Sequence, residues 1–440
     1  MRKAKFLTKA SKQKKIILIE VIVLVLILAV VLLVSCQGGK ESASTTKTAD
    51  QEQNHLFANG LLAVCQDGQW GYVNPKGEFA IAPQFQEVQP FSSQKLAAVS
   101  KDGLWGYINT KGEFVIQPQF ERANIFTDNG LAAVKVEGLW GYINTKGEFA
   151  IQPQLESAWN FDDNGLAAVR QGDLWTFVDA SGKFLREACF ERVGYFGPNG
   201  LVAVRQDSHW GYMNEKGEIV ISPRYSDATI FAEDGLARVC AEGLYGYVNA
   251  EGDYVIDPLF NMAWDFAENG LARVCVKGKY GFINREGEFV TEAVYDIAGD
   301  FEDGKLAPVM EQQLYGYMNA KGEWAIICQF DKANRFAGKD LAAVQQQGQW
   351  GFVNTKGEFV IQPQFTMAQD FADNGLAWVC VDGKWGCINS KGKMVTEAIY
   401  DDCSNFFDDG YAVVEGSEGM GVIDAKGKEI LPAQFDDIWY

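Results

Sequence analysis

Few side chains in this 440-residue sequence have the types and spacing that catalysis requires. The only two histidines, His55 and His209, lie far apart in the chain, so we expect no histidine-based metal site, Ser-His-Asp triad or Cys-His dyad. No glycine-rich phosphate loop of the right spacing is present. Pairs of carboxylates, which glycosidases use, carry no information because acidic residues are so numerous. We therefore expect a binding protein that is not an enzyme, without a cofactor or a metal.

The cysteines allow one disulfide hypothesis. Four of the nine share one position, five residues before an aromatic residue: Cys65, Cys240, Cys275 and Cys380. A disulfide between Cys240 and Cys275 would need Cα atoms within about 7 Å of each other. The interpretation that we favour is a small buried hydrophobic side chain at this position.

Acidic and amide residues recur in short segments before a glycine. They are Asp128-Asn129, Asp162-Asp163-Asn164, Glu268-Asn269, Asp373-Asn374 and Asp408-Asp409. Stacked carboxylates could bind Ca²⁺. Asp and Asn are also ordinary turn residues, and this is the interpretation that we favour.

An exact repeat positions all of these residues. Trp-Gly occurs at Trp70, Trp105, Trp140, Trp210, Trp350 and Trp385, and other bulky residues fill the remaining multiples of 35: Trp175, Tyr245, Tyr280, Tyr315 and Met420. Residues 56–440 therefore form eleven 35-residue units without an insertion. A register kept through eleven units indicates a repeat protein.

The unit 126–160 predicts three antiparallel strands. These are Leu131–Val134, Trp140–Asn144 and Glu148–Ile151, with an Asn-x-Lys-Gly turn before the third. Asn at the first position and Gly at the fourth are typical of a type I turn. We expect the repeated aromatic residue in the core, and we expect a bulky ring to cover the glycine that follows it. After strand three, residues spaced by three predict either a short helical turn or an irregular edge.

The pattern WGYIN-x-KGEFVI-x-P-x-F resembles the bacterial WG-repeat (KWG-repeat) family over residues 56–440. The resemblance implies a β-repeat domain on exported or surface proteins and no particular activity. Departures occur in the fourth unit, which has Trp175-Thr176, and in the last, which has Met420.

The predicted fold class is all-β, a tandem array of eleven three-stranded antiparallel repeats in an open solenoid or superhelical stack. Typical propellers close with four to eight blades, so a propeller-like ring is the alternative. In an open stack the terminal units would act as caps.

Residues that break the repeat are the best candidates for a ligand-binding surface. Nineteen residues after the repeated aromatic position most units have a small or polar residue, but three have Trp159, Trp264 and Trp439. Trp378, Arg238 and Arg273 interrupt a position that is mostly Ala. An exposed Trp can stack on a sugar or on a partner's side chain. The alternative is variable packing at the edge of the array.

Charge distinguishes the N-terminal segment from the body. Residues 1–35 hold seven of the 39 basic residues and one of the 58 acidic residues, which leaves 32 basic and 57 acidic residues, a net charge of −25, in 36–440. Such a body repels phosphate backbones, so we expect no nucleic-acid partner.

The N-terminal segment predicts a membrane attachment. Ile16–Val34 is an apolar run that follows basic residues, which places the rest of the chain outside the cytoplasm. Leu33-Val34-Ser35-Cys36 resembles a lipobox, which would make Cys36 a lipid attachment site; the alternative is an uncleaved signal anchor. Residues 1–35 are thus a signal peptide or membrane anchor, and the polar segment 36–55 is an expected disordered tether.

Together these features predict a protein anchored to the cell membrane, facing outside the cytoplasm, that acts as a binding or scaffold protein. Its expected ligand is a protein or carbohydrate of the cell envelope, recognised through the repeat surface. A structural spacer of the envelope is the alternative, and a cell-wall hydrolase is the least favoured hypothesis.

Overall fold

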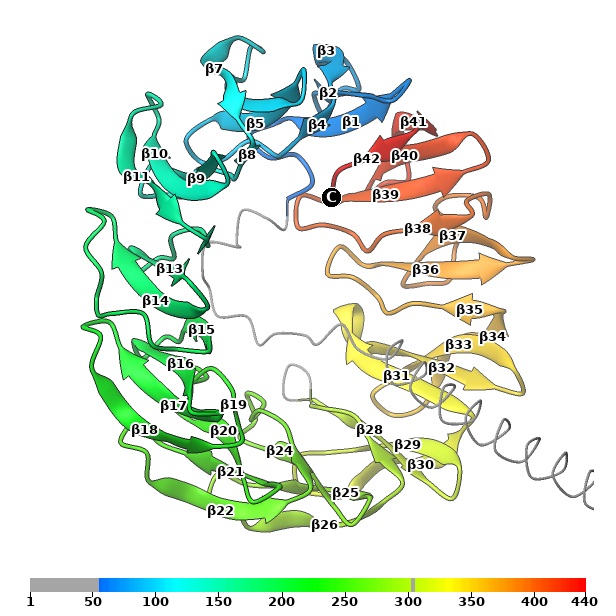
Figure 1. Cartoon of the computed structure of the whole chain (residues 1–440). Coiled ribbons are helices and arrows are strands. Elements are labelled where there is room, and N and C mark those ends of the chain that lie inside the picture. Colours follow the sequence, from blue (N-terminus) through cyan, green and yellow to red (C-terminus); the bar gives the residue numbers. More distant parts are fainter. Residues whose placement is uncertain (1–54, 302–304) are drawn as a thin grey trace, which may run out of the picture. The chain divides into compact units, whose positions relative to one another are not determined.

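The computed structural model describes residues 55–301 and 305–440. The described residues belong to one compact unit, in which eleven antiparallel sheets follow one another around a ring (Figure 1). We number these sheets, or blades, 1 to 11 after the repeat that supplies their longer strands. The all-β expectation is confirmed: within the described ranges the one helical segment is the 3-10 turn Gly338–Asp340.

Each blade begins with a short strand. These strands are β4 (Glu87–Val88), β8 (Arg122–Ala123), β12 (Ser157–Ala158), β15 (Arg192–Phe196), β19 (Asp227–Ala228), β23 (Met262–Ala263), β27 (Ile297–Ala298), β31 (Lys332–Ala337), β35 (Met367–Ala368), β38 (Asp402–Cys403) and β42 (Asp437–Ile438). The second strands are β1 (Leu62–Gln66), β5 (Leu96–Lys101), β9 (Leu131–Val136), β13 (Leu166–Gln171), β16 (Leu201–Gln206), β20 (Ala237–Ala241), β24 (Ala272–Val276), β28 (Ala307–Glu311), β32 (Leu341–Gln346), β36 (Leu376–Val381) and β39 (Tyr411–Gly416).

The third strands are β2 (Gln69–Val73), β6 (Leu104–Asn109), β10 (Leu139–Asn144), β14 (Leu174–Asp179), β17 (His209–Asn214), β21 (Leu244–Val248), β25 (Lys279–Ile283), β29 (Leu314–Met318), β33 (Gln349–Asn354), β37 (Lys384–Asn389) and β40 (Gly419–Asp424). The fourth strands are β3 (Phe79–Phe85), β7 (Phe114–Phe120), β11 (Phe149–Leu155), β18 (Ile219–Tyr225), β22 (Tyr254–Phe260), β26 (Phe289–Tyr295), β30 (Trp324–Phe330), β34 (Phe359–Phe365) and β41 (Glu429–Phe435).

The expected three-stranded sheet is incomplete, because each blade takes one more strand from the preceding repeat. In blade 3, Ala123 of β8 pairs with Val134 of β9, and the sheet order is β11-β10-β9-β8. Nine blades have four strands, whereas blades 4 and 10 have three. In those two the outer strand is reduced to isolated bridges, such as Trp175 with Phe190. The segment predicted as a helical turn or irregular edge is thus mostly a two-residue strand.

The same strand exchange closes the ring, so the expected open solenoid is wrong and the alternative ring is correct. The last strand β42 joins the first blade, where Ile438 pairs with Val64. The Asp436 amide donates a 3.0 Å hydrogen bond to the carbonyl of Cys65, and an Asp436 carboxylate oxygen accepts one of 2.8 Å from the Gly68 amide. Because the last repeat pairs with the first, the array needs no terminal caps.

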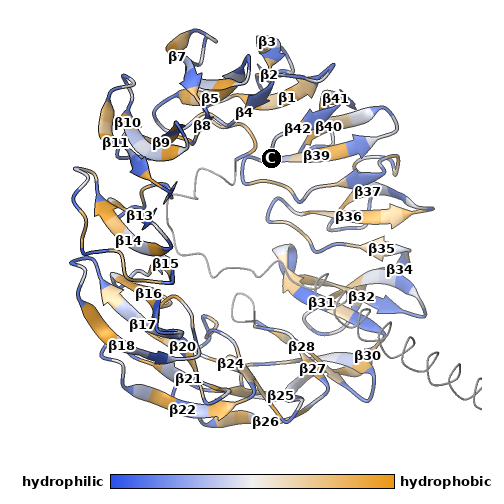
Figure 2. Cartoon of the chain, viewed as in Figure 1, coloured by the Kyte–Doolittle hydropathy of each residue, from blue (hydrophilic) through white to orange (hydrophobic). Residues whose placement is uncertain are grey.

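Hydrophobic clusters lie between neighbouring blades. Tyr107 and Ile116 of blade 2 pack against Ala132, Val134 and Ile143 of blade 3. Hydrophobic residues are concentrated on the strands and hydrophilic ones in the turns (Figure 2). The repeated aromatic residues are only partly core: Trp105 is buried, whereas Trp140 and most of the others are half-buried at the margin of a cluster.

Glycine is required in the Trp-Gly pair for a different reason from the expected one, which was a bulky ring lying over it. A Cβ on Gly106 would lie 2.6 Å from the Ile116 carbonyl oxygen and 2.7 Å from the Pro118 nitrogen. The backbone of the next strand therefore occupies the space, at an irregularity in the β6–β7 ladder. In blade 4 Thr176 stands at this position, and its hydroxyl donates a 2.8 Å hydrogen bond to the Arg186 carbonyl where the outer strand is missing.

The Asn-x-Lys-Gly turn forms as predicted and also joins the blades. The Asn144 side-chain oxygen accepts hydrogen bonds of 2.9 and 3.1 Å from the amides of Lys146 and Glu148. Gly147 has φ +82°, and a Cβ there would lie 3.2 Å from the side chain of Ile116 in the preceding blade. Glycine is therefore needed for both its conformation and its small size.

The predicted N-terminal features mostly fall outside the described residues. Residues 1–35 and Cys36 are among these, as is the tether up to residue 54. In the ranges that the structure does describe, no helix combines the length and apolar character needed to span a membrane.

Candidate functional site

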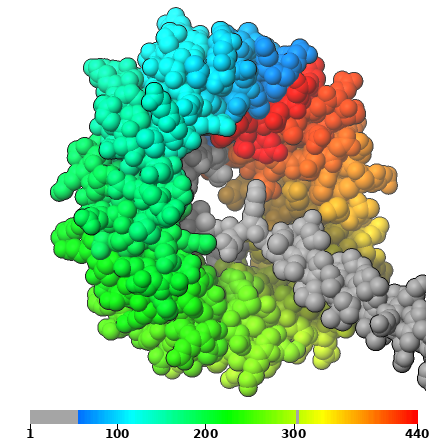
Figure 3. Space-filling view, in the orientation of Figure 1, coloured from blue at the N-terminus to red at the C-terminus, as the bar shows by residue number. Residues whose placement is uncertain are grey.

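Most of the residues that break the repeat lie along the inner edge of the ring, whose outline the space-filling view shows (Figure 3). Strands β11, β18, β22 and β26 lie on the outside (Figure 1), so the short strands at the opposite edge of each sheet face inward. We call the residue after the usual two-residue strand the rim position; it includes Trp159, Trp264 and Trp439.

Each rim residue is joined to one residue of the adjacent strand, which we call its facing residue. The rim amide donates to the facing carbonyl: Trp159 to Ala168 (2.9 Å), Trp264 to Arg273 (3.1 Å) and Trp439 to Ala63 (3.1 Å). Directly opposed residues of an antiparallel pair project to the same side of the sheet. Trp264 and Arg273, which the sequence singled out separately, therefore lie on the same face of blade 7, whereas Trp159 and Trp439 each face an alanine.

Trp264 and Arg273 are in direct contact. The Arg273 guanidinium carbon lies 3.8 Å from the Trp264 ring centroid, in the range of a cation–π interaction. Two guanidinium nitrogens lie 3.1 Å from the carboxylate oxygens of Asp300, and a third donates to the carbonyl of Ala298. The Arg273 side chain is only 15% exposed, so the indole, the guanidinium and the carboxylate form an ordered stack.

Charge pairing extends this stack into the neighbouring blade. Arg238 lies 3.4 Å from Asp265, the residue that follows Trp264. Burial raises the pKa of Asp300, and the positive charges of Arg273 and Arg238 oppose that rise. Burial also lowers the pKa of Arg273, against the effect of Asp300. The two arginines thus serve mainly as internal partners of carboxylates and rings.

Trp159 belongs to an aromatic cluster. Its ring centroid lies 4.9 Å from Tyr195, with 33° between the planes, and 5.5 Å from Trp175. The facing residue is the small Ala168, so Tyr195 lies against the indole in place of an arginine. Tyr195 is 67% exposed and presents a ring to solvent at the inner edge.

The third tryptophan and its neighbour are also exposed. Trp439 is 44% exposed and Tyr440 is 58% exposed. Partial burial raises the pKa of Tyr440, and the nearby carboxylates of Asp402, Asp437 and Glu415 raise it further. This part of the rim is therefore aromatic and acidic.

Trp378 is buried, unlike the other candidates. It is 2% exposed and stacks on Phe406 at 5.6 Å with 14° between the rings. It fills the space between blades 10 and 11, so in this structure it packs in the core.

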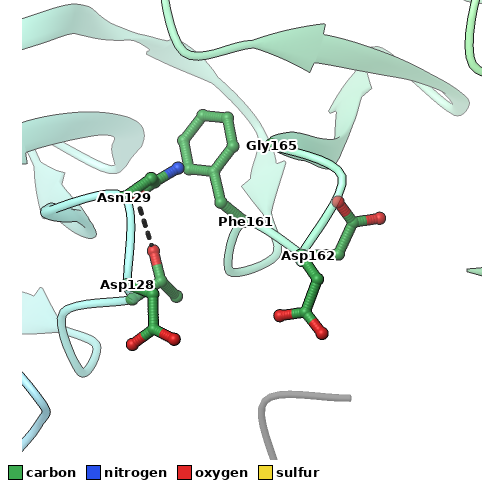
Figure 4. A pocket seen from close by; sticks show the side chains of 7 residues that line it. Asp128, Asn129, Phe161, Asp162 and Gly165 are labelled. Atoms are coloured by element: carbon green, nitrogen blue, oxygen red, sulfur yellow. Dashed lines mark hydrogen bonds between the residues drawn. The ribbon is translucent and has the colours of Figure 1, made fainter. Parts of the chain in front are cut away.

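The acidic turns of blades 3 and 4 line a pocket (Figure 4). The Asn129 side-chain oxygen accepts a 3.0 Å hydrogen bond from the Leu131 amide, and Asp162 accepts two of 3.0 Å from Asn164 and Leu166. Burial raises the pKa of Asp162. Turn hydrogen bonds thus explain the residues that suggested calcium, and the described ranges contain no group of three His, Cys, Asp or Glu that could hold a metal ion.

The cysteines at the shared repeat position are buried free thiols: Cys65, Cys240, Cys275 and Cys380. Their burial agrees with the interpretation as small hydrophobic side chains. Elsewhere, burial followed by the charges of Asp402 and Cys380 raises the pKa of Cys403 to about 12, which leaves this thiol protonated at neutral pH.

The position after the rim also carries residues of the site, although the sequence pattern did not single it out. It holds Tyr195, Tyr440, Asp265 and Asp300, which contact or follow the rim candidates. This position varies as much as the rim itself and holds Pro90 in the first repeat. A comparison of this position across the repeats would have found these residues.

Comparison with known proteins identifies the repeat. Ten segments match the family model described as WG containing repeat: 70–105, 105–140, 140–175, 210–245, 245–280, 280–314, 315–350, 350–385, 385–415 and 420–440. Residues 176–209, where blade 4 lacks its outer strand, are not matched. A search of curated proteins gave no match.

Solved structures with a similar arrangement are distant. A eukaryotic initiation factor has a TM-score of 0.42 and 12% identity, covering 70% of this chain and 96% of its own. Hsv2p of Kluyveromyces lactis has 0.30 and 11%, covering 46% and 74%. PorZ, a surface component of the type-IX secretion system of Porphyromonas gingivalis, has 0.24 and 10%, covering 87% and 65%. These similarities are too low to indicate a ligand.

Proposed function

The chain belongs to the WG-repeat family, and we propose that it is a membrane-tethered extracytoplasmic binding or scaffold protein that recognises a protein or glycan through the inner edge of its ring. The observation that carries this proposal is the exposure of aromatic residues along that edge: Tyr195 in blade 5, and Trp439 and Tyr440 in blade 1, at 67%, 44% and 58% exposure. Exposed aromatic side chains on a rigid scaffold are typical of binding surfaces.

Ring closure weighs against the alternative of a structural spacer. The pairing of Val64 with Ile438 joins the ends of the array, so adding repeats would not lengthen it along one direction. Hydrolysis is also less favoured. The carboxylate of Asp162 in the turn pocket is committed to backbone amides, which fixes it as part of the turn.

The proposed location rests on the sequence of the N-terminal segment. Ile16–Val34 would cross or enter the membrane, and Cys36 would carry a lipid. Metabolic labelling with a fatty acid tests the lipid, with Cys36→Ala as the control. Label that persists in this variant would contradict attachment at Cys36, and protection of the ring from external protease in intact cells would contradict an extracytoplasmic body.

Affinity capture from the cell envelope tests the binding function. The full chain in detergent micelles is used as bait beside a variant with Tyr195, Trp439 and Tyr440 changed to Ala. A matched control changes three equally exposed apolar residues of outer strands: Leu259 (62%), Val294 (57%) and Ile327 (69%). We expect specific capture to be lost only in the inner-edge variant. Loss only in the outer variant, or no specific capture at all, would contradict the proposal.

A further inference from the structure

The three rim tryptophans differ in what lies against their rings. Trp264 lies against the guanidinium of Arg273 and the ring of Tyr280, and Trp159 contacts two aromatic rings. Among residues 55–301 and 305–440, neither a cation nor an aromatic ring lies against Trp439. Trp439 is 44% exposed, so part of this residue is accessible to a ligand.

The repeat itself indicates what kind of group fits this face. Trp264 and Trp439 occupy equivalent positions and donate the same backbone hydrogen bond, to Arg273 and Ala63 respectively. The side chain that covers the Trp264 ring is thus reduced to a methyl group opposite Trp439. Blade 1 therefore has no guanidinium of its own at the place where blade 7 has that of Arg273.

Negative charge near Trp439 favours a cation there. Asp437 lies two residues before Trp439, at the start of the strand β42 that Trp439 follows, so in extended chain its side chain would project to the same side about 7 Å away. Asp402 and Glu415 are paired with each other on the adjacent strands β38 and β39 of the neighbouring blade. The acidic body strengthens the attraction over a longer range. Asp300 has no equivalent beside Trp439, because its repeat position holds Pro90. The negative charge comes instead from Asp437, the acidic residue nearest to Trp439 in the sequence.

We propose that Trp439 binds an arginine side chain of a basic partner protein, in the way that Trp264 binds Arg273 within the ring. The proposal rests on the binding function above and names its ligand chemistry at one point of the inner edge. Arginine fits better than lysine because its planar, weakly hydrated guanidinium stacks on an aromatic face while still pairing with a carboxylate.

Peptide binding to the full chain in detergent micelles tests this site. The probe is a fluorescent peptide of alternating glycine and arginine, compared with a peptide that has citrulline, which is neutral but similar in shape, in place of arginine. We expect binding of the arginine peptide and none of the citrulline peptide. Trp439→Ala should weaken binding about tenfold, the loss expected for one desolvated cation–π contact. The matched variants Trp159→Ala and Trp264→Ala should change it less than twofold.

A second variant keeps every ring in place. Ala63→Arg would supply an internal guanidinium opposite Trp439, as Arg273 does opposite Trp264, and should reduce peptide affinity as much as Trp439→Ala does. A thermal unfolding midpoint at or above that of the parent would show that the new side chain is accommodated.

Three results would overturn the proposal: no affinity for the arginine peptide, equal affinity for the citrulline or a lysine peptide, or an affinity that neither Trp439→Ala nor Ala63→Arg changes. These results are distinguishable from failure of the binding function. If envelope capture depends on the inner edge but is unaffected by both single substitutions, the binding function stands and the arginine site at Trp439 does not.

Discussion

The hydroxyl of Tyr142 donates a 2.7 Å hydrogen bond to the backbone carbonyl of Trp159. This bond joins the third strand of blade 3 to the inner-edge segment of blade 4. In the same residue, the amide of Trp159 donates to the carbonyl of Ala168. The same tyrosine bond recurs in five other blades, at Tyr72, Tyr107, Tyr212, Tyr247 and Tyr317. A buried core residue thus sets the backbone position of each rim residue that it holds.

Replacing Tyr142 with Phe should destabilise the ring by about 1–3 kcal/mol, because a carbonyl away from water loses its partner. Urea unfolding followed by circular dichroism measures the change. Tyr195→Phe is the control, since its hydroxyl is on an exposed ring and its loss should cost little. Equal effects of the two substitutions would argue against a structural role for the Tyr142 bond.

The buried tyrosines should make the protein sensitive to alkaline pH. Burial raises the pKa of Tyr72, Tyr107 and Tyr142, as well as that of the equivalent tyrosines in other blades. In the unfolded chain these groups ionise near pH 10. The folded state keeps these tyrosines neutral, so their contribution to the free energy of unfolding is complete below about pH 10. As the pH rises above this value, that contribution falls by about 1.4 kcal/mol per pH unit for each tyrosine.

Urea midpoints measured between pH 8 and 11 test this expectation. The decline above pH 10 should be shallower in Tyr142→Phe than in the parent, because one linked group has been removed. A stability that stays constant to pH 11, or the same slope in both proteins, would contradict it.

The Trp-Gly glycine should not tolerate a methyl group. In Gly106→Ala the Cβ would lie 2.6 Å from the Ile116 carbonyl oxygen, so the outer strand must move, at a cost of about 3 kcal/mol or more. Gly138→Ala is the matched control: its φ is +81° but the space around it is open, so only the backbone strain of about 1–2 kcal/mol applies. Chemical denaturation distinguishes the two, and an equal loss would show that the close approach to Ile116 is unimportant.

The strands of one repeat could be predicted because their signals are local. The sequence predicted Trp140–Asn144, and β10 spans Leu139–Asn144, since the turn that follows is set by Asn144 and Gly147 alone. Closure could not be predicted in this way. The angle between blades depends on contacts such as Ile116 against Gly147, and these would recur in an open stack as well as in a ring.

The sequence predicted individual residues of the candidate site but not how they lie relative to one another. Trp264 and Arg273 were singled out separately, because the register that places them opposite each other belongs to the two-residue strand β23, which is too short to show a hydrophobic period. Trp378 was predicted as a surface residue but is buried. It replaces a small residue, yet Phe406 stacks on it in the core, and only the neighbouring blade determines that.

Removing the Arg273 guanidinium should create a binding site for a small cation. Arg273→Ala leaves the Trp264 face open and Asp300 without its ion pair, with an expected loss of stability of about 1–3 kcal/mol. Millimolar methylguanidinium should raise the melting temperature of this variant more than that of the parent, because it binds only the folded form. Arg238→Ala, which leaves the Trp264 stack intact, is the control. Equal effects of the additive on all three proteins would show that the stack has no affinity for a free guanidinium.

Ring closure by β42 should contribute to stability and prevent self-association. Truncation after Phe435 removes the pairs Val64–Ile438 and Cys65–Asp437 and leaves β1 as an open edge, which is a template for pairing with another chain. We expect faster hydrogen exchange in β1 and dimers in size-exclusion chromatography with light scattering. Removal of residues 439–440 alone keeps both pairs and should leave the protein monomeric, with slow exchange in β1. If both truncations behave alike, the last strand does not close the ring in solution.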